Sequence, residues 1–367
     1  MRALIVAGEA SGDLHAANLL QALRAAEPAL AAFGVGGPRL REAGLECIER
    51  SEELSVMGLA EVVRHLPRLL GIARHVRRTA VERRPDVAVL VDSPDFNLPL
   101  ARHLRAAGIP VLVYVSPQLW AWRSGRVRRI RRDVRKVLCI LPFETEFYAR
   151  HGVDAEYVGH PLVDELTPVM EAPPARDPDA LALLPGSRWH EVESLLPTML
   201  EAAASLRDEG VARFRLIAAP GLDAERLAAM AARASVSVEL VTGDRHRALA
   251  TCQAAMVASG TATLECALLG VPMVVGYRLH AISYLLAKLM VDVPHVALVN
   301  LVAGKRIAAE AVQGDFNRSQ LLVEARRLFG EAGDRQREAL AEVRRRLGGP
   351  GASARAAAAV LTLAGRR

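Results

Sequence analysis

Cysteine is rare in this 367-residue chain: it occurs four times, and no two cysteines form a CxxC pair. The usual zinc spacings are therefore excluded, nothing indicates a disulfide framework, and a reducing compartment is expected. No apolar run approaches the ~18 to 20 residues of a membrane-spanning helix. The first apolar run ends before Glu9 and is too short for a secretory signal. The sequence predicts a protein that is neither exported nor transmembrane, which still allows it to lie on a membrane surface.

Several ligand-binding motifs are also missing. The chain contains neither the GxGxxG pattern of dinucleotide-binding folds nor the GxxxxGK[ST] pattern of P-loops. No DxD motif stands at the carboxyl end of a predicted strand, so we expect no metal and no cofactor. With 51% hydrophobic and 24% charged residues, the composition is that of a globular protein rather than a disordered one.

What the chain does contain is a regular alternation of apolar, β-rich runs with helical patterns. Continuous apolar strands separated by helices are typical of a parallel sheet that is covered on both faces. The alternation stops over residues 169–178, which are rich in proline, and then begins again. We therefore predict two doubly wound α/β domains, residues 1–168 and 179–345, joined by a linker at 169–178. A C-terminal helix over residues 346–367 is expected at the domain junction.

Loops after the strands are the candidate sites, because ligands of such sheets bind beside the carboxyl ends of strands. One loop of the second domain reads VASGTATLE and contains Ser259, Gly260, Thr261 and Glu265. Backbone N–H groups at a helix start suit a phosphate, and Glu265 can accept hydrogen bonds from a ribose diol. The alternative is a capped helix with a solvated glutamate.

A second loop of the same domain reads LLPGSRWHEVE and places Gly186, Ser187 and Arg188 between a strand and a helix. Two N–H groups and a planar, permanently charged guanidinium suit a diphosphate. A surface arginine on a turn is the alternative. Two such loops in one domain favour a nucleotide diphosphate as the ligand.

In the first domain, the glycine-rich segment VAGEASGDLH contains Glu9, Ser11 and His15. The segment LVDSPDFN places Asp92 at the end of a predicted strand, and Asp95 follows shortly after. A carboxylate in that position can act as a general base. Helix N-capping is the alternative role.

Two basic segments point to an anionic partner. Residues 57–78 combine a helical apolar stripe with five arginines, as helices on anionic membranes do. A core-facing stripe is the alternative, and Pro67 predicts a break into two shorter helices. Residues 123–136 hold eight basic residues beside Trp120 and Trp122, which suits a nucleic acid, an anionic lipid headgroup or a solvated helix.

Nine motifs together, in this order and at this spacing, resemble the lipid-A-disaccharide synthase family over nearly the whole chain. They are AGEASGD, ELSVMGLAEV, DSPDFN, YVSPQLWAWR, LPFETEFY, LLPGSR, ASGTATLE, MVVGYR and NLVAGK. The resemblance implies a GT-B-like fold, in which two Rossmann-like domains face a central cleft. It also implies an inverting, metal-independent glycosyltransferase. UDP-2,3-diacylglucosamine would donate its sugar to the 6-hydroxyl of 2,3-diacylglucosamine 1-phosphate, giving the β-1,6-linked disaccharide 1-phosphate and UDP.

The same resemblance assigns roles to residues of this chain. Asp92 would be the base, and Glu9, Ser11 and Asn300 match other positions associated with activity. The donor would be held by a larger set: Gly186, Ser187, Arg188, Ser259, Gly260, Thr261, Glu265 and Gln313. The protein would lie on the cytoplasmic face of the inner membrane through residues 57–78. The family is compatible with a homodimer, and no nucleic-acid partner is expected.

Two other functions explain part of the pattern. Another GT-B enzyme that uses a UDP-N-acetylhexosamine, either an N-acetylglucosaminyltransferase or a 2-epimerase, would need the same UDP loops but leaves residues 57–78 unexplained. A nucleic-acid-binding protein would use residues 123–136. Sequence-specific RNA binding that survives physiological salt would distinguish it from any basic surface.

Overall fold

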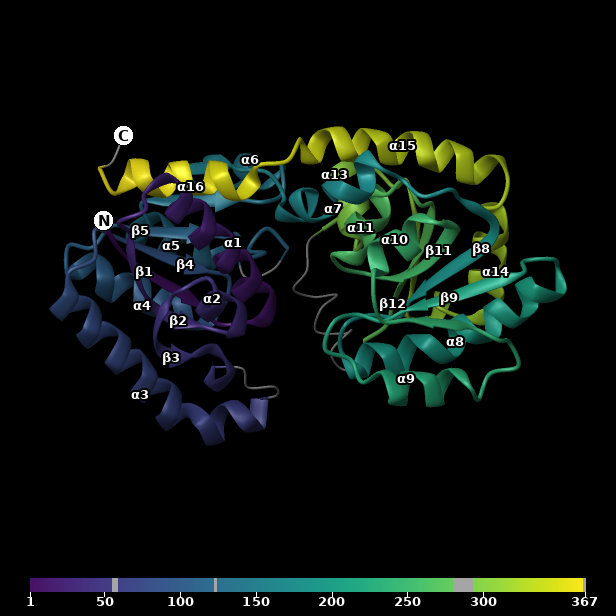
Figure 1. The fold of residues 1–367 in the computed structure, drawn as a ribbon, viewed down its shortest axis with the longest axis horizontal. Coiled ribbons are helices and arrows are strands. Elements are labelled where there is room, and N and C mark those ends of the chain that lie inside the picture. The colour runs from purple at the N-terminus through teal and green to yellow at the C-terminus, as the bar shows by residue number, and fades with distance from the viewer. Residues whose placement is uncertain (55–58, 122–123, 280–292, 366–367) are drawn as a thin grey trace. The chain divides into compact units, whose positions relative to one another are not determined.

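The computed structural model describes residues 1–54, 59–121, 124–279 and 293–365. The chain forms two compact units. The first contains Met1–Pro161 and Gly349–Arg367, and the second contains Leu162–Gly348 (Figure 1). No helix among the described residues is both long and apolar enough to span a bilayer.

The first unit is a parallel sheet with helices on its faces. In the described part of this unit the sheet has seven strands in the order β3-β2-β1-β4-β5-β6-β7. The strands are β1 (Arg2–Ala7), β2 (Ala31–Gly36), β3 (Glu46–Arg50), β4 (Val87–Val91), β5 (Val111–Tyr114), β6 (Lys136–Cys139) and β7 (Ala155–Tyr157). The helices are α1 (Ala10–Ala26), α2 (Pro38–Glu42), α3 (Leu59–Arg83), α4 (Pro94–Ala106), α5 (Val127–Asp133), α6 (Glu144–Arg150) and α16 (Ala352–Leu363).

The second unit repeats this design. Its described strands form a six-stranded parallel sheet in the order β10-β9-β8-β11-β12-β13. They are β8 (Asp177–Leu184), β9 (Arg213–Ile217), β10 (Glu239–Val241), β11 (Cys252–Ala258), β12 (Met273–Tyr277) and β13 (Ala309–Val312). The helices are α7 (Pro161–Glu171), α8 (Trp189–Asp208), α9 (Ala224–Ala231), α10 (Arg245–Ala250), α11 (Ala262–Leu268), α13 (Leu298–Ala303), α14 (Arg318–Arg327) and α15 (Glu331–Leu347).

Burial explains why the central strands are uniformly apolar. Every residue of β4, with the sequence VAVLV, is fully buried, because helices cover both faces of the sheet. The register aligns Leu4 of β1 with Ala88 of β4 and with Phe33 of β2. In the second unit, Met256 of β11 lies opposite Leu183 of β8 and Val274 of β12. Each unit therefore has its own apolar core.

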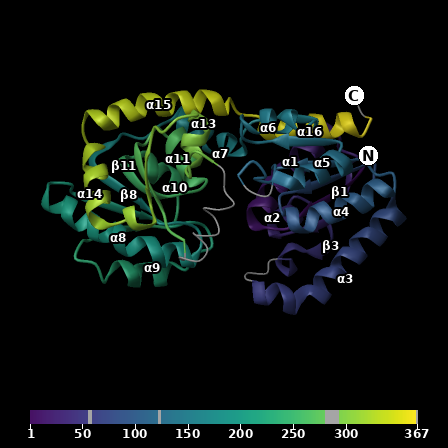
Figure 2. The same ribbon diagram turned by 180° about the vertical axis from the view of Figure 1, so that it is seen from behind.

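The segment between the two sheets differs from the predicted linker. The units divide at Pro161, ahead of residues 169–178, and α7 continues to Glu171 with Pro168 inside it. The short break before β8 therefore spans only residues 172–176. The C-terminal helix α16 belongs to the first unit, where it packs against α1 (Figures 1 and 2).

The predicted break at Pro67 is wrong, because α3 continues through this residue. A proline costs a helix one hydrogen bond, and Pro67 itself lies on the exposed side of α3. The helix has two kinds of surface. Ile72, Val76 and Ala80 are buried in the core, whereas Leu66 and Leu70 are 46% and 45% exposed. Residues 57–58 and the side chains of residues 59–65 lie outside the part described, as do Trp122 and Arg123.

Candidate active site

The strand order of the first sheet reverses between β1 and β4, so the chain leaves these neighbouring strands toward opposite sides. Ligands of open α/β sheets bind in the crevice that forms at such a switch point. Glu9 and Ser11 follow β1, and Asp92 follows β4. The topology therefore brings the predicted residues of the first domain to one place.

Close packing joins these two loops. A Cβ atom at Gly8 would lie 2.4 Å from Ser93 Oγ, so only glycine lets the loop after β1 approach the loop after β4. A methyl group at Gly12 would contact Asp92 Cβ at 3.6 Å. Glu9 and Ser11 are exposed beside this contact, and Asp92 is half-buried. Asp13 has a structural role, because its carboxylate accepts the N–H groups of Gly37, Arg39 and Leu40.

The backbone at the end of β4 is strained. Asp92 and Ser93 have φ angles of +50° and +44°, in the left-handed region that side chains other than glycine rarely adopt. The buried Asn97 side chain holds this turn by donating to Val91 O at 3.1 Å and to Asp92 O at 2.7 Å. Val115, at the end of the adjacent strand β5, has a φ of +61°. Strain of this kind clusters at functional sites, where the surrounding structure enforces it.

A buried polar network supports the neighbouring loops after β5 and β6. The Glu144 carboxylate accepts the indole N–H of Trp120 at 3.0 Å and the N–H groups of Ile140 and Leu141 at 3.2 and 3.1 Å. Ser116 donates to Tyr148 Oη at 2.9 Å. Burial raises the pKa of Glu144 to about 7, against the lowering effect of these hydrogen bonds. This carboxyl therefore serves to hold the loop that carries the SPQLW segment.

Two imidazoles, the half-buried His15 and the buried His160, lie near the start of α1. Burial lowers the pKa of His15 to about 4, and it lowers the pKa of His160 to about 3 with a further contribution from the proximity of His15. His15 Nδ1 is buried and has no hydrogen-bond partner among the described residues. Both histidines are therefore neutral at pH 7.

The second sheet reverses its order between β8 and β11. The loops that follow these two strands are the two that were predicted to bind a diphosphate: 185–188 after β8 and 259–261 after β11. The C-terminal unit therefore has its own switch point, and the candidate donor residues of these two loops gather there, whereas Gln313 follows the edge strand β13.

Internal contacts already occupy part of the 185–188 loop. Glu191 Oε2 accepts the N–H groups of Ser187 at 2.9 Å and of Arg188 at 3.2 Å, which makes it part of a capping box for α8. Gly186 has a φ of +121°, and a Cβ there would lie 2.5 Å from the same carboxylate oxygen. The Arg188 side chain is 59% exposed, and its Nη1 lies 3.7 Å from Glu191 Oε1. Glu191 thus holds the N–H groups that the sequence assigned to a phosphate.

The loop after β11 is held by its hydroxyl groups. Ser259 donates to Val296 O at 2.8 Å, and Thr263 donates to Gly260 O at 2.8 Å. Thr261 is exposed, and Gly260 is partly exposed with no neighbouring side chain crowding it. The loop is therefore fixed in position while its surface stays open.

Glu265 lies in a buried charged cluster. Arg245 Nη1 donates to both carboxylate oxygens at 3.1 and 3.0 Å, and His246 Nε2 lies 3.7 Å from Oε2, a distance that suits a charged pair better than a direct hydrogen bond. Burial raises the pKa of Glu265, but His246 and Arg245 outweigh this, and the net pKa is below the ordinary value. Glu165 of α7 also pairs with Arg245, at 3.5 Å.

Asn300 is fully buried, and both the nitrogen and the oxygen of its side-chain amide form hydrogen bonds. Nδ2 donates to Ala308 O and to Glu310 Oε1, and Oδ1 accepts the N–H groups of Ile307 and Ala308. Glu310 also accepts the N–H groups of Val296 and Ala297. The Asn300 side chain therefore links α13 to β13. Gln313, with a φ of +54°, exchanges two hydrogen bonds with the backbone of Leu279.

Sequence reasoning missed several residues of this site. Glu191 had a signal, since a glutamate three residues into a predicted helix is the mark of a capping box. Arg245, His246 and Glu310 had none, because their partners are distant in the sequence, and neither had the link from Glu144 to Trp120. Among the described residues no group of three or more His, Cys, Asp or Glu side chains could hold a metal ion.

Solved structures with a similar arrangement of strands and helices identify the fold. A glycosyltransferase of kitacinnamycin covers 99% of this chain and 98% of its own, with a TM-score of 0.68 and 17% identity. MurG of Acinetobacter baumannii covers 98% and 99%, with a TM-score of 0.62 and 16% identity. The UDP-GlcNAc 2-epimerase of Neisseria meningitidis covers 99% and 100%, with a TM-score of 0.67 and 11% identity. The two doubly wound units thus have the GT-B fold of glycosyltransferases.

Sequence comparison gives the family. The lipid-A-disaccharide synthetase family matches residues 3–362. The lipid-A-disaccharide synthase of Anaeromyxobacter dehalogenans strain 2CP-1 is 49% identical over 370 residues, which are 98% of this chain and 96% of that protein. That of Myxococcus xanthus is 46% identical over 372 residues, covering 99% and 97%. The chain belongs to the lipid-A-disaccharide synthase family, which confirms the resemblance of its motifs.

Proposed function

We propose that this chain transfers 2,3-diacylglucosamine from UDP to the 6-hydroxyl of 2,3-diacylglucosamine 1-phosphate. The acceptor oxygen bonds to the anomeric carbon, the bond from that carbon to the UDP phosphate oxygen breaks, and UDP leaves with the electron pair. The product is the β-1,6-linked disaccharide 1-phosphate. The observation that carries this proposal is the strained turn that presents the half-buried Asp92 at the switch point of the first sheet, in a chain of this family.

In this proposal Asp92 accepts the proton of the 6-hydroxyl as it attacks, because a carboxylate at the end of a strand is suited to that role. Asp95 is a poor alternative, since it is exposed on the first turn of α4 and pairs with Arg126 at 2.5 Å. Glu9, the N-cap of α1, and Ser11, in the first turn of that helix, lie beside the contact with Asp92, where they orient the acceptor sugar.

The second unit holds the donor. Arg188 and the N–H groups at the start of α11 receive the diphosphate and stabilise charge on the leaving UDP without a metal ion, whereas the N–H groups of Ser187 and Arg188 reach it only after Glu191 has released them. Glu265 accepts the ribose hydroxyls, which requires a shift of its pairing with Arg245. We assign Asn300 a positioning role, because its amide is fully buried and fixes α13 beside the Ser259 loop. Gln313 orients the chain at Leu279 in the same way.

The acyl chains of both substrates require a membrane or micelle. We propose that the protein lies on the cytoplasmic face of the inner membrane through residues 57–78, and that it can form a homodimer. The support is the pair of exposed leucines on α3, Leu66 and Leu70, on a helix that also bears exposed Arg68 and Arg74. Ile72 and Val76 of this helix pack into the core and take no part.

Turnover of purified protein in detergent tests the reaction. The assay follows disaccharide 1-phosphate and UDP by mass spectrometry, with the two acylated substrates and no added metal. We expect product from these substrates and none from unacylated UDP-N-acetylglucosamine. Efficient use of the unacylated donor would instead identify a different UDP-sugar enzyme.

A further inference from the structure

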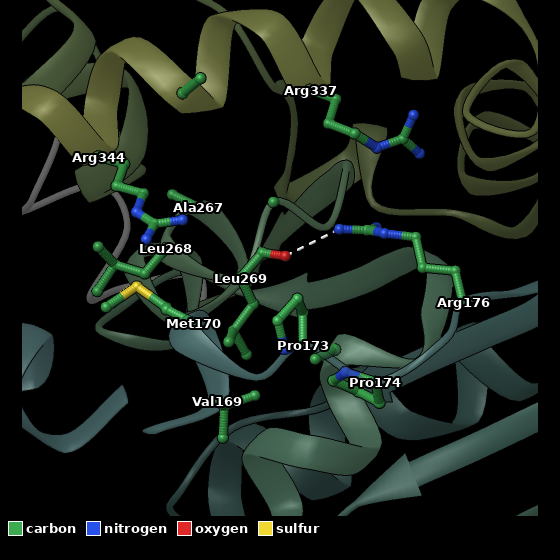
Figure 3. A pocket seen from close by; sticks show the side chains of 13 residues that line it. Val169, Met170, Pro173, Pro174, Arg176, Ala267, Leu268, Leu269, Arg337 and Arg344 are labelled. Atoms are coloured by element: carbon green, nitrogen blue, oxygen red, sulfur yellow. Dashed lines mark hydrogen bonds between the residues drawn. The ribbon is translucent and has the colours of Figure 1, made fainter. Parts of the chain in front are cut away.

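The arginines around a cavity of about 400 Å³ in the second unit lie apart from one another (Figure 3). The cavity is lined by α7 and the residues after it, by the end of α11 and by α15. Arg344 lies beside Met170 and Leu268. Arg176 lies away from it and donates to Leu269 O at 2.9 Å. The cavity does not gather these charges at one point, whereas a buried polar side chain of the first unit, beside the proposed base, has a more informative pattern of hydrogen bonds.

The side chain of Asn97 makes two hydrogen bonds around a single residue. Its Nδ2 donates to Val91 O at 3.1 Å and to Asp92 O at 2.7 Å. These carbonyls belong to the peptide groups immediately before and after the Cα atom of Asp92, so one amide holds two rigid peptide planes. The N–H group of Asp92 is held as well, because it donates to Tyr114 O at 3.2 Å. Backbone rotation at Asp92 is therefore restrained on both sides, which fixes the direction of its Cα–Cβ bond.

The partners of this amide also determine its orientation. If the amide were flipped, Oδ1 would face two carbonyl oxygens with no hydrogen atom between them. In the orientation observed, Asn97 Oδ1 is buried and has no hydrogen-bond partner among the described residues. The residue is only 2% exposed, so bulk water does not reach this oxygen. Asn97 thus uses both of its donors and leaves its acceptor without a donor.

This arrangement is unfavourable for stability. A buried acceptor without a donor costs free energy, and so do the left-handed conformations of Asp92 and Ser93. Glycine adopts a positive φ without that cost, as Gly186 does at the end of β8. A turn with no role beyond stability is not expected to combine these features. What the combination achieves is a single direction for the Asp92 carboxylate.

We infer that Asn97 is a positioning residue for the sugar transfer and acts through Asp92. It fixes the carboxylate in the direction from which it accepts the proton of the 6-hydroxyl, and its burial keeps it from touching either substrate. A small misplacement of a catalytic group lowers the rate of the chemical step. The inference rests on the proposed function, since it needs Asp92 as the base. The effect of Asn97 belongs to kcat and exists only while the Asp92 carboxylate is present.

A double-mutant cycle on the full-length protein tests this inference. Four proteins are compared in detergent with both acylated substrates: the unmodified protein, Asn97→Ser, Asp92→Asn and the double variant. Single-turnover rates report the chemical step, and calorimetry gives the Kd for UDP. We expect Asn97→Ser to lower the rate at least tenfold, with KM and Kd within twofold. In the Asp92→Asn background the same substitution should change the residual rate by less than twofold.

Two further variants separate positioning from a loss of stability. Asn97→Asp keeps the size of the side chain but replaces the donating nitrogen by an oxygen, and it should also lower the rate at least tenfold. Leu104→Val removes one methylene group from the buried face of the same helix. It should lower the melting temperature and keep turnover within twofold of the unmodified protein. Circular dichroism verifies that each variant is folded at the assay temperature.

The results that would overturn the inference are specific. They are full turnover in folded Asn97→Ser, an equal loss of rate in both backgrounds, or a loss confined to KM or to UDP affinity. Failure of both Asn97 variants to fold would overturn it too, because Asn97 would then serve the fold alone. An unmodified protein that forms no disaccharide would refute the proposed function and this inference with it, whereas the other results leave the proposed function standing.

Discussion

The two switch points of this molecule are built by opposite means. At the end of β4, Asp92 and Ser93 adopt left-handed conformations although neither is glycine, and Asn97 holds them there. At the end of β8, Gly186 supplies the positive φ, and Glu191 satisfies the exposed N–H groups. The first loop stores strain around a single carboxylate, whereas the second is relaxed and rich in donors.

The difference in backbone strain fits the two roles proposed for these loops, activation of the acceptor and binding of the donor. A base must be aimed at one atom, and a strained backbone with few alternatives fixes its direction. A diphosphate has many equivalent oxygens, so a relaxed loop with an exposed arginine, whose N–H groups Glu191 can release, receives it without strain. We therefore expect changes in the first loop to affect the rate of transfer and changes in the second to affect binding of the donor.

The largest expected effect comes from Asp92→Asn. Asparagine tolerates the left-handed conformation, so the turn should persist while the base is lost. General-base catalysis contributes about 10²- to 10⁴-fold, and we expect turnover to fall by that amount. The measurement is the initial rate of disaccharide formation. Asp95→Asn is the matched control and should stay near the unmodified rate; equal losses in both variants would contradict the assignment.

Arg188→Gln should act on the donor. A hydrogen bond to a charged group contributes about 1.5–3 kcal/mol, so the Kd for UDP should rise about 10- to 100-fold. Arg226→Gln removes another partly exposed arginine of the same unit, one that stacks on Trp189, and should leave the Kd unchanged. Unaltered UDP affinity in Arg188→Gln would place the diphosphate elsewhere.

His15 and His160, which both lie in the first unit, make the stability of the protein sensitive to acid. Because the pKa of His15 is about 4 in the folded state and 6.5 ordinarily, the unfolded chain binds the proton more readily between these values. The stability that neutral His15 contributes is present above pH 6.5 and is lost as pH falls toward 4. His15→Gln should therefore lose less stability than the unmodified protein over pH 6.5–4, measured by urea unfolding. If the free energy of unfolding fell by the same amount with pH in both proteins, this prediction would be refuted.

The raised pKa of Glu144 has the opposite effect on how stability changes with pH. In the folded state the pKa of Glu144 is about 7, above the ordinary 4.5. The stability that the protonated carboxyl contributes is therefore fully present below pH 4.5 and is lost as pH rises through 7. Glu144→Gln should keep the hydrogen bond from Trp120 without a charge, and its stability should fall less than that of the unmodified protein between pH 5 and 8. Thermal unfolding monitored by tryptophan fluorescence measures this, and a steeper fall would contradict it.

The smallest effect should come from Glu191→Ala. Loss of a capping interaction costs about 1 kcal/mol, because the Ser187 and Arg188 N–H groups lose their acceptor. We expect this decrease in the free energy of unfolding, together with UDP binding that is unchanged or tighter, since no carboxylate then competes with the diphosphate. Glu193→Ala, on the same helix but outside the cap, is the control. A large loss of UDP affinity would mean that Glu191 organises the loop for its ligand.

Much of this architecture follows from the sequence, because its strongest signal is burial. Strands such as VAVLV and RALIVA are apolar throughout, and the structure has them as β4 and β1. The strands β3, β7 and β13 lack this signal, since ECIER, AEY and AEAV are short and only partly buried at the sheet edges. Their pairing with a neighbour, rather than their own composition, makes them strands.

The residues of the candidate site also fall into those that the sequence predicts and those that only the structure reveals. Loops after apolar strands could be located from the pattern, and motif resemblance selected Asp92 and Arg188. The fully satisfied amide of Asn300, the Arg245 partner of Glu265 and the strain at Asp92 depend on contacts between distant segments or on backbone angles. No local pattern contains that information.

The equilibrium affinity of Asp92→Asn for UDP tests the central claim most directly, because the claim separates chemistry from donor binding. Calorimetry on the purified variant should give a Kd within twofold of the unmodified protein, while its turnover is nearly lost. A tenfold or greater loss of UDP affinity would contradict the account, since it would mean that the strained loop of the first unit holds the donor rather than activating the acceptor.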